Sequence, residues 1–243
     1  MSTMKTLEIL DLYDRDTRSL TVARMAEMLN QPQSSVYRHV RILKEKGYLM
    51  DDHEGNYRLG YKFLKFSKIV SMDTNITTVS YPIMQQLTKD TGETTILMVY
   101  SHLQSICLLS VNSGEPVKVS SEVGQIFPLY GGASSKALLA YLSEDIVNEL
   151  FEKDIVKKHT DNTIVNIEEL KNDLKKIREK GYAFSDSEID DGVIGYGVPI
   201  FNYSNKPIAS LSILGPRERL LEKNSEELID KLQKAREEIQ TYL

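Results

Sequence analysis

The sequence has a single cysteine and no apolar run long enough to cross a membrane. Cys107 has no partner for an internal disulfide, which fits the reducing cytoplasm, so we expect a cytoplasmic protein. The thiol lies in the apolar run 105–109, and this favours a buried, inert side chain. No stretch approaches the roughly 20 apolar residues that a membrane helix needs, so we predict no membrane partner.

The sequence also lacks the motifs that catalysis would need. It contains no G-x-S-x-G nucleophile turn and no G-x-x-x-x-G-K-[ST] phosphate loop. Its four histidines are scattered and show no metal-ligand spacing with Cys107. The acidic residues Asp186, Glu188, Asp190 and Asp191 could hold a cation, although such loops are usually only solvated. We therefore predict no catalytic residue, no metal and no cofactor.

Charge is divided unevenly along the chain. Residues 1–72 contain 12 lysines and arginines against 9 aspartates and glutamates, a balance of +3. Residues 73–243 contain 18 against 26, a balance of −8. This division suggests that only the basic N-terminal part contacts an anionic partner.

The first 30 residues predict two short helices. Met4, Leu7 and Leu10 recur at a spacing of three, which indicates one face of the first helix. Thr21 is suited to cap the second helix, because its hydroxyl can accept a bond from a free backbone amide.

A third helix and a hairpin follow. Pro32 suits the first turn of a helix, and Gly47 suits its C-terminal end. The runs 48–50 and 57–59 flank a turn-rich segment, which is typical of a hairpin. Helix, turn, helix and hairpin make up a winged helix-turn-helix, whose third helix enters the major groove of DNA.

The third helix has an apolar side and a polar side. Val36, Val40 and Leu43 are predicted to face inward, and no acidic residue occurs from 31 to 44, as an approach to phosphate requires. The outward side carries residue types that donate to base edges and phosphates: Gln33, Ser34, Ser35, Tyr37, Arg38 and Arg41.

Position on that helix suggests separate roles. Gln33, Ser34 and Ser35 are candidates to read bases because residues near the helix start reach deepest, whereas Arg38 and Arg41 are candidates to bind phosphate. A plain three-helix bundle with a solvated polar face, or a winged helix that docks a protein, remains an alternative.

The hairpin contributes less certain candidates. It could place His53, Asn56 or Arg58 against the DNA backbone or the minor groove. The carboxylates of Asp51, Asp52 and Glu54 would then meet phosphate, so both outcomes stay open. Arg58 is retained as a DNA-binding candidate.

The rest of the chain predicts a linking helix and a second domain. We expect domains at 1–60 and 74–243, joined by a helix over 61–73. Strands and helices without strict alternation predict an α+β domain around an antiparallel sheet. The expected elements are a helix to about Lys89, extended runs at 94–100, 105–111, 182–188, 193–201 and 208–214, two or three helices over 134–180, and a closing helix from about Arg219, with Leu221, Leu228, Leu232, Ala235 and Ile239 on one side.

The order of short motifs resembles the IclR family of regulators, named for the isocitrate lyase regulator. The N-terminal part carries Q-S-S-V-Y-R at 33–38, G-Y-L at 47–49 and Y-R-L-G at 57–60. The C-terminal part carries V-G at 123–124, P-L at 128–129, A-S-S-K-A at 133–137, I-R-E-K-G-Y at 177–182, G-V at 192–193, P-I at 199–200, L-S at 211–212 and G-P at 215–216.

The resemblance implies a DNA-binding regulator that is controlled by a small molecule. It implies a GAF-like effector domain, a homodimer or dimer of dimers, and palindromic operators. Effectors in the family are usually organic acids or aromatic catabolites, and its members include repressors and activators. The alternative from another class is an enzyme or protein-docking module that carries a winged helix.

One candidate wall of an effector pocket lies where the helix of Lys136 begins. Gly132, Ala133 and Ser134 open that helix, where glycine lets a ligand approach the backbone and free amides can hold a carboxylate. An ordinary loop and helix cap is the alternative. Strand alternation supplies a second wall, because Gly195 shares a face with Gly197, and Ser212 with Leu214.

Three positions depart from the family pattern. Relatives often carry a cysteine at the Gly195 position, a serine at the Leu214 position and an acid at the Ser185 position, whereas Ser212 keeps the family's residue. Glycine would empty volume from the pocket, so we hypothesise a ligand larger or less polar than the smallest oxoacids. Alternatively, the glycines only relieve sheet twist. The effector-binding candidates are Gly132, Ala133, Ser134, Ser185, Gly195, Ser212 and Leu214.

Overall fold

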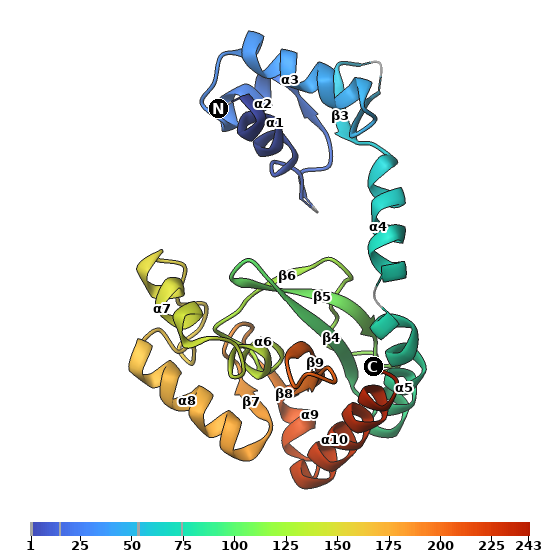
Figure 1. The fold of residues 1–243 in the computed structure, drawn as a ribbon, viewed down its shortest axis with the longest axis vertical. Coiled ribbons are helices and arrows are strands. Elements are labelled where there is room, and N and C mark those ends of the chain that lie inside the picture. Colours follow the sequence, from blue (N-terminus) through green and yellow to red (C-terminus); the bar gives the residue numbers. More distant parts are fainter. Residues whose placement is uncertain (1, 15, 53, 74) are drawn as a thin grey trace. The chain divides into compact units, whose positions relative to one another are not determined.

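The computed structural model describes residues 2–14, 16–52, 54–73 and 75–243. The chain divides into two compact units, Met1–Thr74 and Asn75–Leu243 (Figure 1). No helix in these described stretches is long and apolar enough to cross a membrane.

The first unit combines helices with a small sheet. In chain order its elements are α1 (Ser2–Leu10), β1 (Leu20–Thr21), α2 (Val22–Met28), α3 (Gln33–Glu45), β2 (Leu49–Asp51), β3 (Asn56–Leu59) and α4 (Lys62–Asp73). The three strands pair antiparallel in the order β1-β3-β2. This is the predicted winged helix-turn-helix, with a two-residue strand β1 that the sequence did not reveal.

The core of this unit lies between α1, α2 and α3. Val36, Val40 and Leu43 are buried, as predicted for the inward side of α3. The predicted helix α1 is present, but the face marked by Met4 and Leu7 is exposed, and Ile9 is the residue of that helix in the buried core.

Local capping explains where α2 and α3 begin and end. The Thr21 hydroxyl accepts a bond from the Arg24 amide at 3.2 Å, which confirms the predicted cap of α2. Pro32 stands at the N-cap position of α3, one residue before the predicted first turn, and provides no side-chain capping bond. Gly47 follows that helix with a φ of 76°, a left-handed conformation that favours glycine.

The second unit is built around one antiparallel sheet. Its elements are α5 (Asn75–Thr91), β4 (Thr94–Ser101), β5 (Gln104–Val111), β6 (Ile126–Pro128), α6 (Ala133–Leu139), α7 (Glu144–Glu152), α8 (Ile167–Lys180), β7 (Ala183–Asp186), β8 (Val193–Phe201), β9 (Pro207–Pro216), α9 (Arg217–Leu221) and α10 (Ser225–Thr241). The six strands lie in the order β6-β5-β4-β9-β8-β7, which confirms the predicted α+β class.

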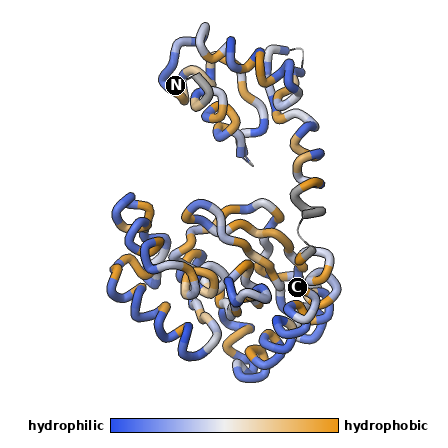
Figure 2. Tube along the Cα trace, in the orientation of Figure 1, coloured by the Kyte–Doolittle hydropathy of each residue, from blue (hydrophilic) through white to orange (hydrophobic). Residues whose placement is uncertain are grey.

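Helices cover the two faces of this sheet. α5 and α10 lie side by side and pack on one face through one large apolar cluster, whereas α6, α7 and α8 form a second cluster on the other face (Figure 1). In Figure 2 the strands are mostly hydrophobic, whereas α8 and α10 contain many hydrophilic residues. Burial on both sides explains why β8 and β9 read as nearly continuous apolar runs.

The chain closes with two helices instead of the single predicted one. The Asn224 side chain accepts bonds from the amides of Glu226 and Glu227, so a new helix, α10, begins there. Leu221 therefore precedes the break and is exposed, which corrects its predicted place on the apolar side. Leu228, Leu232, Ala235 and Ile239 are buried as predicted.

Candidate functional site

The outer face of α3 presents the predicted DNA-binding side chains together. Gln33, Ser34, Tyr37, Arg38 and Arg41 are exposed, and Ser35 is half-buried. The inner face is fixed by the apolar core and by a bond of 2.8 Å between the buried His39 ring and the Thr6 hydroxyl on α1. The inner side of α3 is therefore fixed against the core of the first unit, and its polar side faces outward.

The two arginines of α3 differ in their surroundings. Within the described part of the chain, the Arg38 side chain forms no ion pair and no hydrogen bond. Arg41 lies 3.5 Å from Glu45 one turn along the helix, and both side chains are exposed. An exposed pair of this kind contributes little, so either arginine is available to an external anion.

The hairpin of β2 and β3 organises its own acidic residues. Lys44 pairs with Asp51 at 2.6 Å, which offsets the charge of that carboxylate. The Asp52 carboxylate accepts bonds from the Glu54 amide and from the backbone and side chain of Asn56, and these bonds lower its pKa. Asn56 is thus engaged within the hairpin.

Arg58 is exposed on β3 and has no side-chain partner among the described residues, so it is the available basic group of the hairpin. His53, the other candidate there, lies outside the described residues.

A cavity of about 80 Å³ lies in the second unit, between the sheet and the start of α6. Its apolar floor includes Ile96 and Met98 of β4, with Phe127 and Leu214. Five predicted effector-binding residues line it: Gly132, Ala133, Ser134, Ser185 and Leu214.

Gly195 and Ser212 do not line this cavity. A Cβ atom on Gly195 would lie 2.6 Å from the Leu214 side chain, and one on Gly197 would lie 2.6 Å from the Ala133 carbonyl oxygen. Gly195 therefore makes room for the side chain of Leu214 on the neighbouring strand, and Gly197 lets the start of α6 approach the sheet. The expectation that they empty volume from the pocket was wrong, because neighbouring atoms fill that space.

A strap of residues 187–191 covers one side of the cavity. Its Ile189 lies so close to Gly131 that a Cβ atom there would be 2.5 Å from the isoleucine Cδ1. The hydroxyls of Thr160 and Thr163 donate to the carbonyl groups of Ser187 and Glu188, at 2.5 and 2.6 Å. These contacts fix the strap to the loop that precedes α8.

Beneath the strap, Lys136 forms a buried ionic cluster. Its side chain is 1% exposed, and its Nζ lies 2.5 Å from Glu188 and 2.8 Å from Asp173 of α8. The second Glu188 oxygen accepts the Gly132 amide at 3.0 Å. Burial raises the pKa of Glu188, partly offset by the positive charge of Lys136. An amide that we expected to hold a ligand carboxylate is thus bonded to a carboxylate of the chain itself.

Asp186, another of the predicted cation-binding residues, is also engaged. Asp186 accepts both bonds from the Arg217 guanidinium Nε, at 2.8 and 3.0 Å, and this contact lowers its pKa. Over the described residues, no group of three or more candidate ligands is arranged to hold a metal ion.

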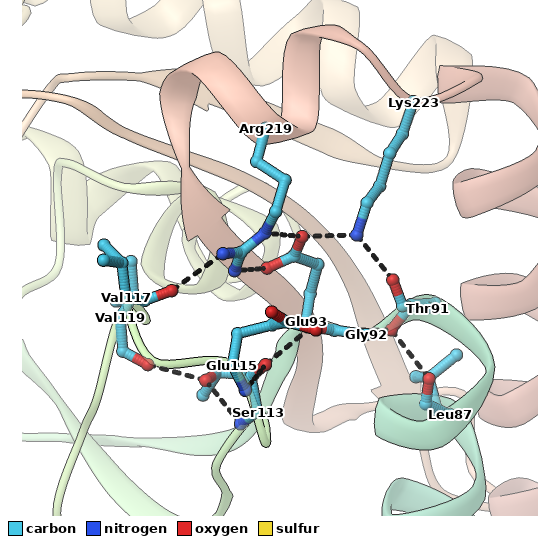
Figure 3. A network of polar contacts seen from close by, with 11 residues as sticks. Leu87, Thr91, Gly92, Glu93, Ser113, Glu115, Val117, Val119, Arg219 and Lys223 are labelled. Carbon is cyan, nitrogen blue, oxygen red and sulfur yellow. Dashed lines mark hydrogen bonds and ion pairs between the residues drawn. The ribbon is translucent and has the colours of Figure 1, made fainter.

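Another wall of the cavity is a loop that includes Val119, Ser120 and Ser121. A polar network ties this loop to the start of β4 and to α9 (Figure 3). The Thr94 hydroxyl donates to the Val119 carbonyl at 2.6 Å, and Arg219 donates to the Val117 carbonyl at 2.7 Å. The loop therefore depends on side chains that lie outside the cavity.

Glu93 stands at the centre of that network. Its side chain is 0% exposed, and it pairs with both Arg219 and Lys223 (Figure 3). Lys223 also donates to the Thr91 carbonyl at 2.6 Å, at the end of α5. Sequence reasoning missed this cluster because its members lie more than 120 residues apart, and no local pattern links them.

Comparison with known proteins places both units in one family. Residues 2–53 match the IclR helix-turn-helix domain, and residues 69–241 match the C-terminal domain described as bacterial transcriptional regulator IclR C-terminal. The HTH-type transcriptional regulator KipR of Bacillus subtilis is 27% identical over 96% of this chain and 92% of its own length.

Solved structures agree with this placement. The Thermotoga maritima IclR structure is 32% identical, has a TM-score of 0.74, and covers 100% of this chain and 98% of its own. An IclR homolog from Microbacterium hydrocarbonoxydans, solved with 4-hydroxybenzoate, is 23% identical with a TM-score of 0.85, over 99% of this chain and 98% of its own.

Proposed function

The chain belongs to the IclR family of bacterial transcriptional regulators, and we propose that a small molecule in the cavity of its second unit controls its binding to operator DNA. DNA-binding transcription regulation is the function of this family, and the relatives are regulators and not enzymes. The alternative of an enzyme that carries a winged helix is therefore set aside.

The outer face of α3 is the proposed DNA-reading surface. Gln33, Ser34 and Ser35 lie in its first turn and are proposed to contact bases, with Tyr37 beside them. Arg38 and Arg41, one turn further on, are proposed to contact phosphates, together with Arg58 of the hairpin. The observation that carries this assignment is that Arg38 is exposed and has no side-chain partner among the described residues, beside other polar residues on the outer face of α3.

A palindromic operator and a symmetric oligomer complete the proposed binding mode. A homodimer, or a dimer of dimers, would place two α3 helices in successive major grooves, about 34–36 Å apart or a multiple of that distance. Such a regulator works on the chromosome, so a cytoplasmic location is part of the proposal. The family resemblance includes repressors and activators, and the proposal covers both.

The cavity is the proposed effector site. It is enclosed by the start of α6, the sheet, the strap and the loop at 119–121, and it includes five of the seven residues predicted from sequence. The relative solved with 4-hydroxybenzoate supports a small-molecule ligand in this fold. A bound molecule would act through the helix α4 (Lys62–Asp73), which joins the units along the chain. Control requires its affinity to differ between two arrangements of the protein, typically by about 1–3 kcal/mol.

The test is a titration of the full chain with DNA from upstream of its own gene, followed by fluorescence anisotropy at two salt concentrations. We expect saturable binding that survives competitor DNA and weakens as salt rises, since phosphate contacts release counterions. Addition of candidate small molecules should then shift the DNA affinity. Weak binding that disappears with salt on every fragment would contradict sequence-specific regulation and favour a winged helix that docks protein.

A further inference from the structure

The charges around the cavity carry information about its ligand. Among the described residues that line it, the charged ones are Glu188 and Asp190, and none is lysine, arginine or histidine. Lys136 offsets the charge of Glu188, so a ligand carboxylate in the cavity would meet the carboxylate of Asp190 and no cationic side chain. A like charge at the mouth of the cavity opposes binding of an anion, although solvent partly screens the exposed Asp190.

The buried lysine beneath the strap does not supply the missing cation. Lys136 Nζ is bonded to Glu188 and Asp173, and its side chain is 1% exposed. Glu188 in turn has both carboxylate oxygens bonded, one to Lys136 and one to the Gly132 amide. This satisfied cluster offers neither a free cation to an acid nor a free anion to an amine.

Uncharged hydrogen-bonding groups are present and have no partner. Ser121, Ser134 and Ser185 line the cavity and are only 5%, 5% and 6% exposed. Their hydroxyls form no hydrogen bond within the described residues. None of the three oxygens is among the fully buried atoms that lack a partner, so they open onto the cavity and can bond to a polar ligand there.

We propose that the cavity binds a small uncharged molecule with hydroxyl or carbonyl groups, which bond to Ser121, Ser134 and Ser185, and that it disfavours organic acids. The inference rests on the proposed effector site and narrows its ligand class. The apolar floor of Ile96 and Met98 would contact the carbon skeleton of the ligand.

The test uses probes of one skeleton that differ in charge. We would compare 4-hydroxybenzamide (uncharged), 4-hydroxybenzoate (anionic) and 4-hydroxybenzylamine (cationic), and the smaller set of lactamide, lactate and 1-amino-2-propanol. Binding to the full chain is measured by ligand-observed NMR and, where affinity allows, by calorimetry. We expect each amide to bind at least about tenfold more tightly than its matched acid.

Variants then separate charge from general damage to the site. Glu188→Gln and the exposed Asp190→Asn should each reduce the preference for amide over acid, because each removes a negative charge from the lining. Asp190→Asn serves if Glu188→Gln fails to fold. Ser121→Ala and Ser185→Ala should each weaken amide binding by about two- to tenfold. Ser210→Ala is the matched control, because Ser210 is a buried, unpaired serine that does not line the cavity.

Three outcomes would overturn the inference. If the acids bind as tightly as the amides, or more tightly, the ligand class is wrong while the effector cavity stands. If the amines bind best, the cavity selects cations. If no probe of either skeleton binds, the cavity is not a site for small polar molecules. The DNA-binding function is tested separately, by the anisotropy titration with operator DNA, so its failure can be told apart from failure of the ligand inference.

Discussion

Arg219 binds Glu93 at two points, with its Nε 2.7 Å from one carboxylate oxygen and its Nη2 2.5 Å from the other. Its remaining nitrogen, Nη1, donates to the Val117 carbonyl on the loop that forms a wall of the cavity. One planar guanidinium thus joins a fully buried carboxylate to a loop at the surface, a geometry that lysine cannot reproduce.

Removing this guanidinium should destabilise the second unit. We expect Arg219→Ala to lower the free energy of unfolding by about 3–5 kcal/mol, because it leaves a buried carboxylate short of a partner. Urea unfolding followed by circular dichroism measures the change. Arg217→Ala is the control on the same helix, since its pair with Asp186 is partly exposed and should contribute no more than about 1 kcal/mol. Equal losses in the two variants would contradict a special role for Glu93.

Gly197 should not accept a methyl group without cost. Its Cβ would lie 2.6 Å from the Ala133 carbonyl oxygen and 2.8 Å from the Ser212 hydroxyl oxygen, so Gly197→Ala must move α6 from the sheet. We expect a loss of about 1–3 kcal/mol in urea unfolding. Gly114→Ala is the matched control because a Cβ there meets no atom within 4 Å, and it should be neutral or slightly stabilising. If Gly197→Ala unfolds like the control, the close approach of α6 is incorrect.

Replacement of Arg38 should weaken DNA binding without changing which sequence is preferred. A phosphate contact acts on all sequences alike, so Arg38→Ala should lower the slope of log affinity against log salt by about 1. Ser34→Ala should instead change the ratio of cognate to random DNA affinity. Lys175→Ala, an exposed cation on α8, controls for net charge and should leave both quantities unchanged. If both variants weaken binding to cognate and to random DNA by the same factor, Ser34 does not read bases and the assigned roles are wrong.

Cys107 should resist thiol reagents while the protein is folded. Burial raises the pKa of this thiol from 9.0 to about 11, so the reactive thiolate is roughly a hundredfold scarcer in the folded than in the unfolded chain at pH 8. The measurement is the rate of alkylation with and without urea.

The raised pKa also affects stability, because the thiol of the unfolded chain loses its proton at a lower pH than the thiol of the folded chain. The free energy of unfolding should therefore fall as the pH rises from 9 towards 11. Cys107→Ser should lack this part of the decline, and fast labelling of the folded protein would contradict the burial.

Sequence patterns predicted long elements better than short ones. β8 and β9 follow extended apolar runs and were expected within a few residues. β1 and β6 have two and three residues, too few for any periodicity, and they exist because a neighbouring strand offers hydrogen-bonding partners. The sequence pattern did not identify the buried side of α1, because a spacing of three fits more than one side of a short helix. Ile9 is buried because it packs in the core beside the residues of α3.

The candidate sites divide in the same way. The exposed residues of α3 follow from one amphipathic pattern, so they could be found locally. Three of the five predicted cavity residues, Gly132, Ala133 and Ser134, lie at the start of α6, where sequence carries a strong signal, whereas the other two lie within strands. The partners of Lys136, namely Asp173 and Glu188, come from distant elements and needed the tertiary fold. Asn224 was a missed local signal, because an asparagine followed by two glutamates within three residues is a common helix start.

The position of β9 has a consequence for synthesis of the protein on the ribosome. It is the last strand in the sequence, yet it lies between β4 and β8 and alone joins the two halves of the sheet. The first unit can fold as soon as it emerges, whereas the sheet stays in two pieces until residue 216 is made, roughly 8–30 s later at ordinary elongation rates. A truncated mRNA that ends before β9 would therefore yield the first unit without a complete sheet in the second unit.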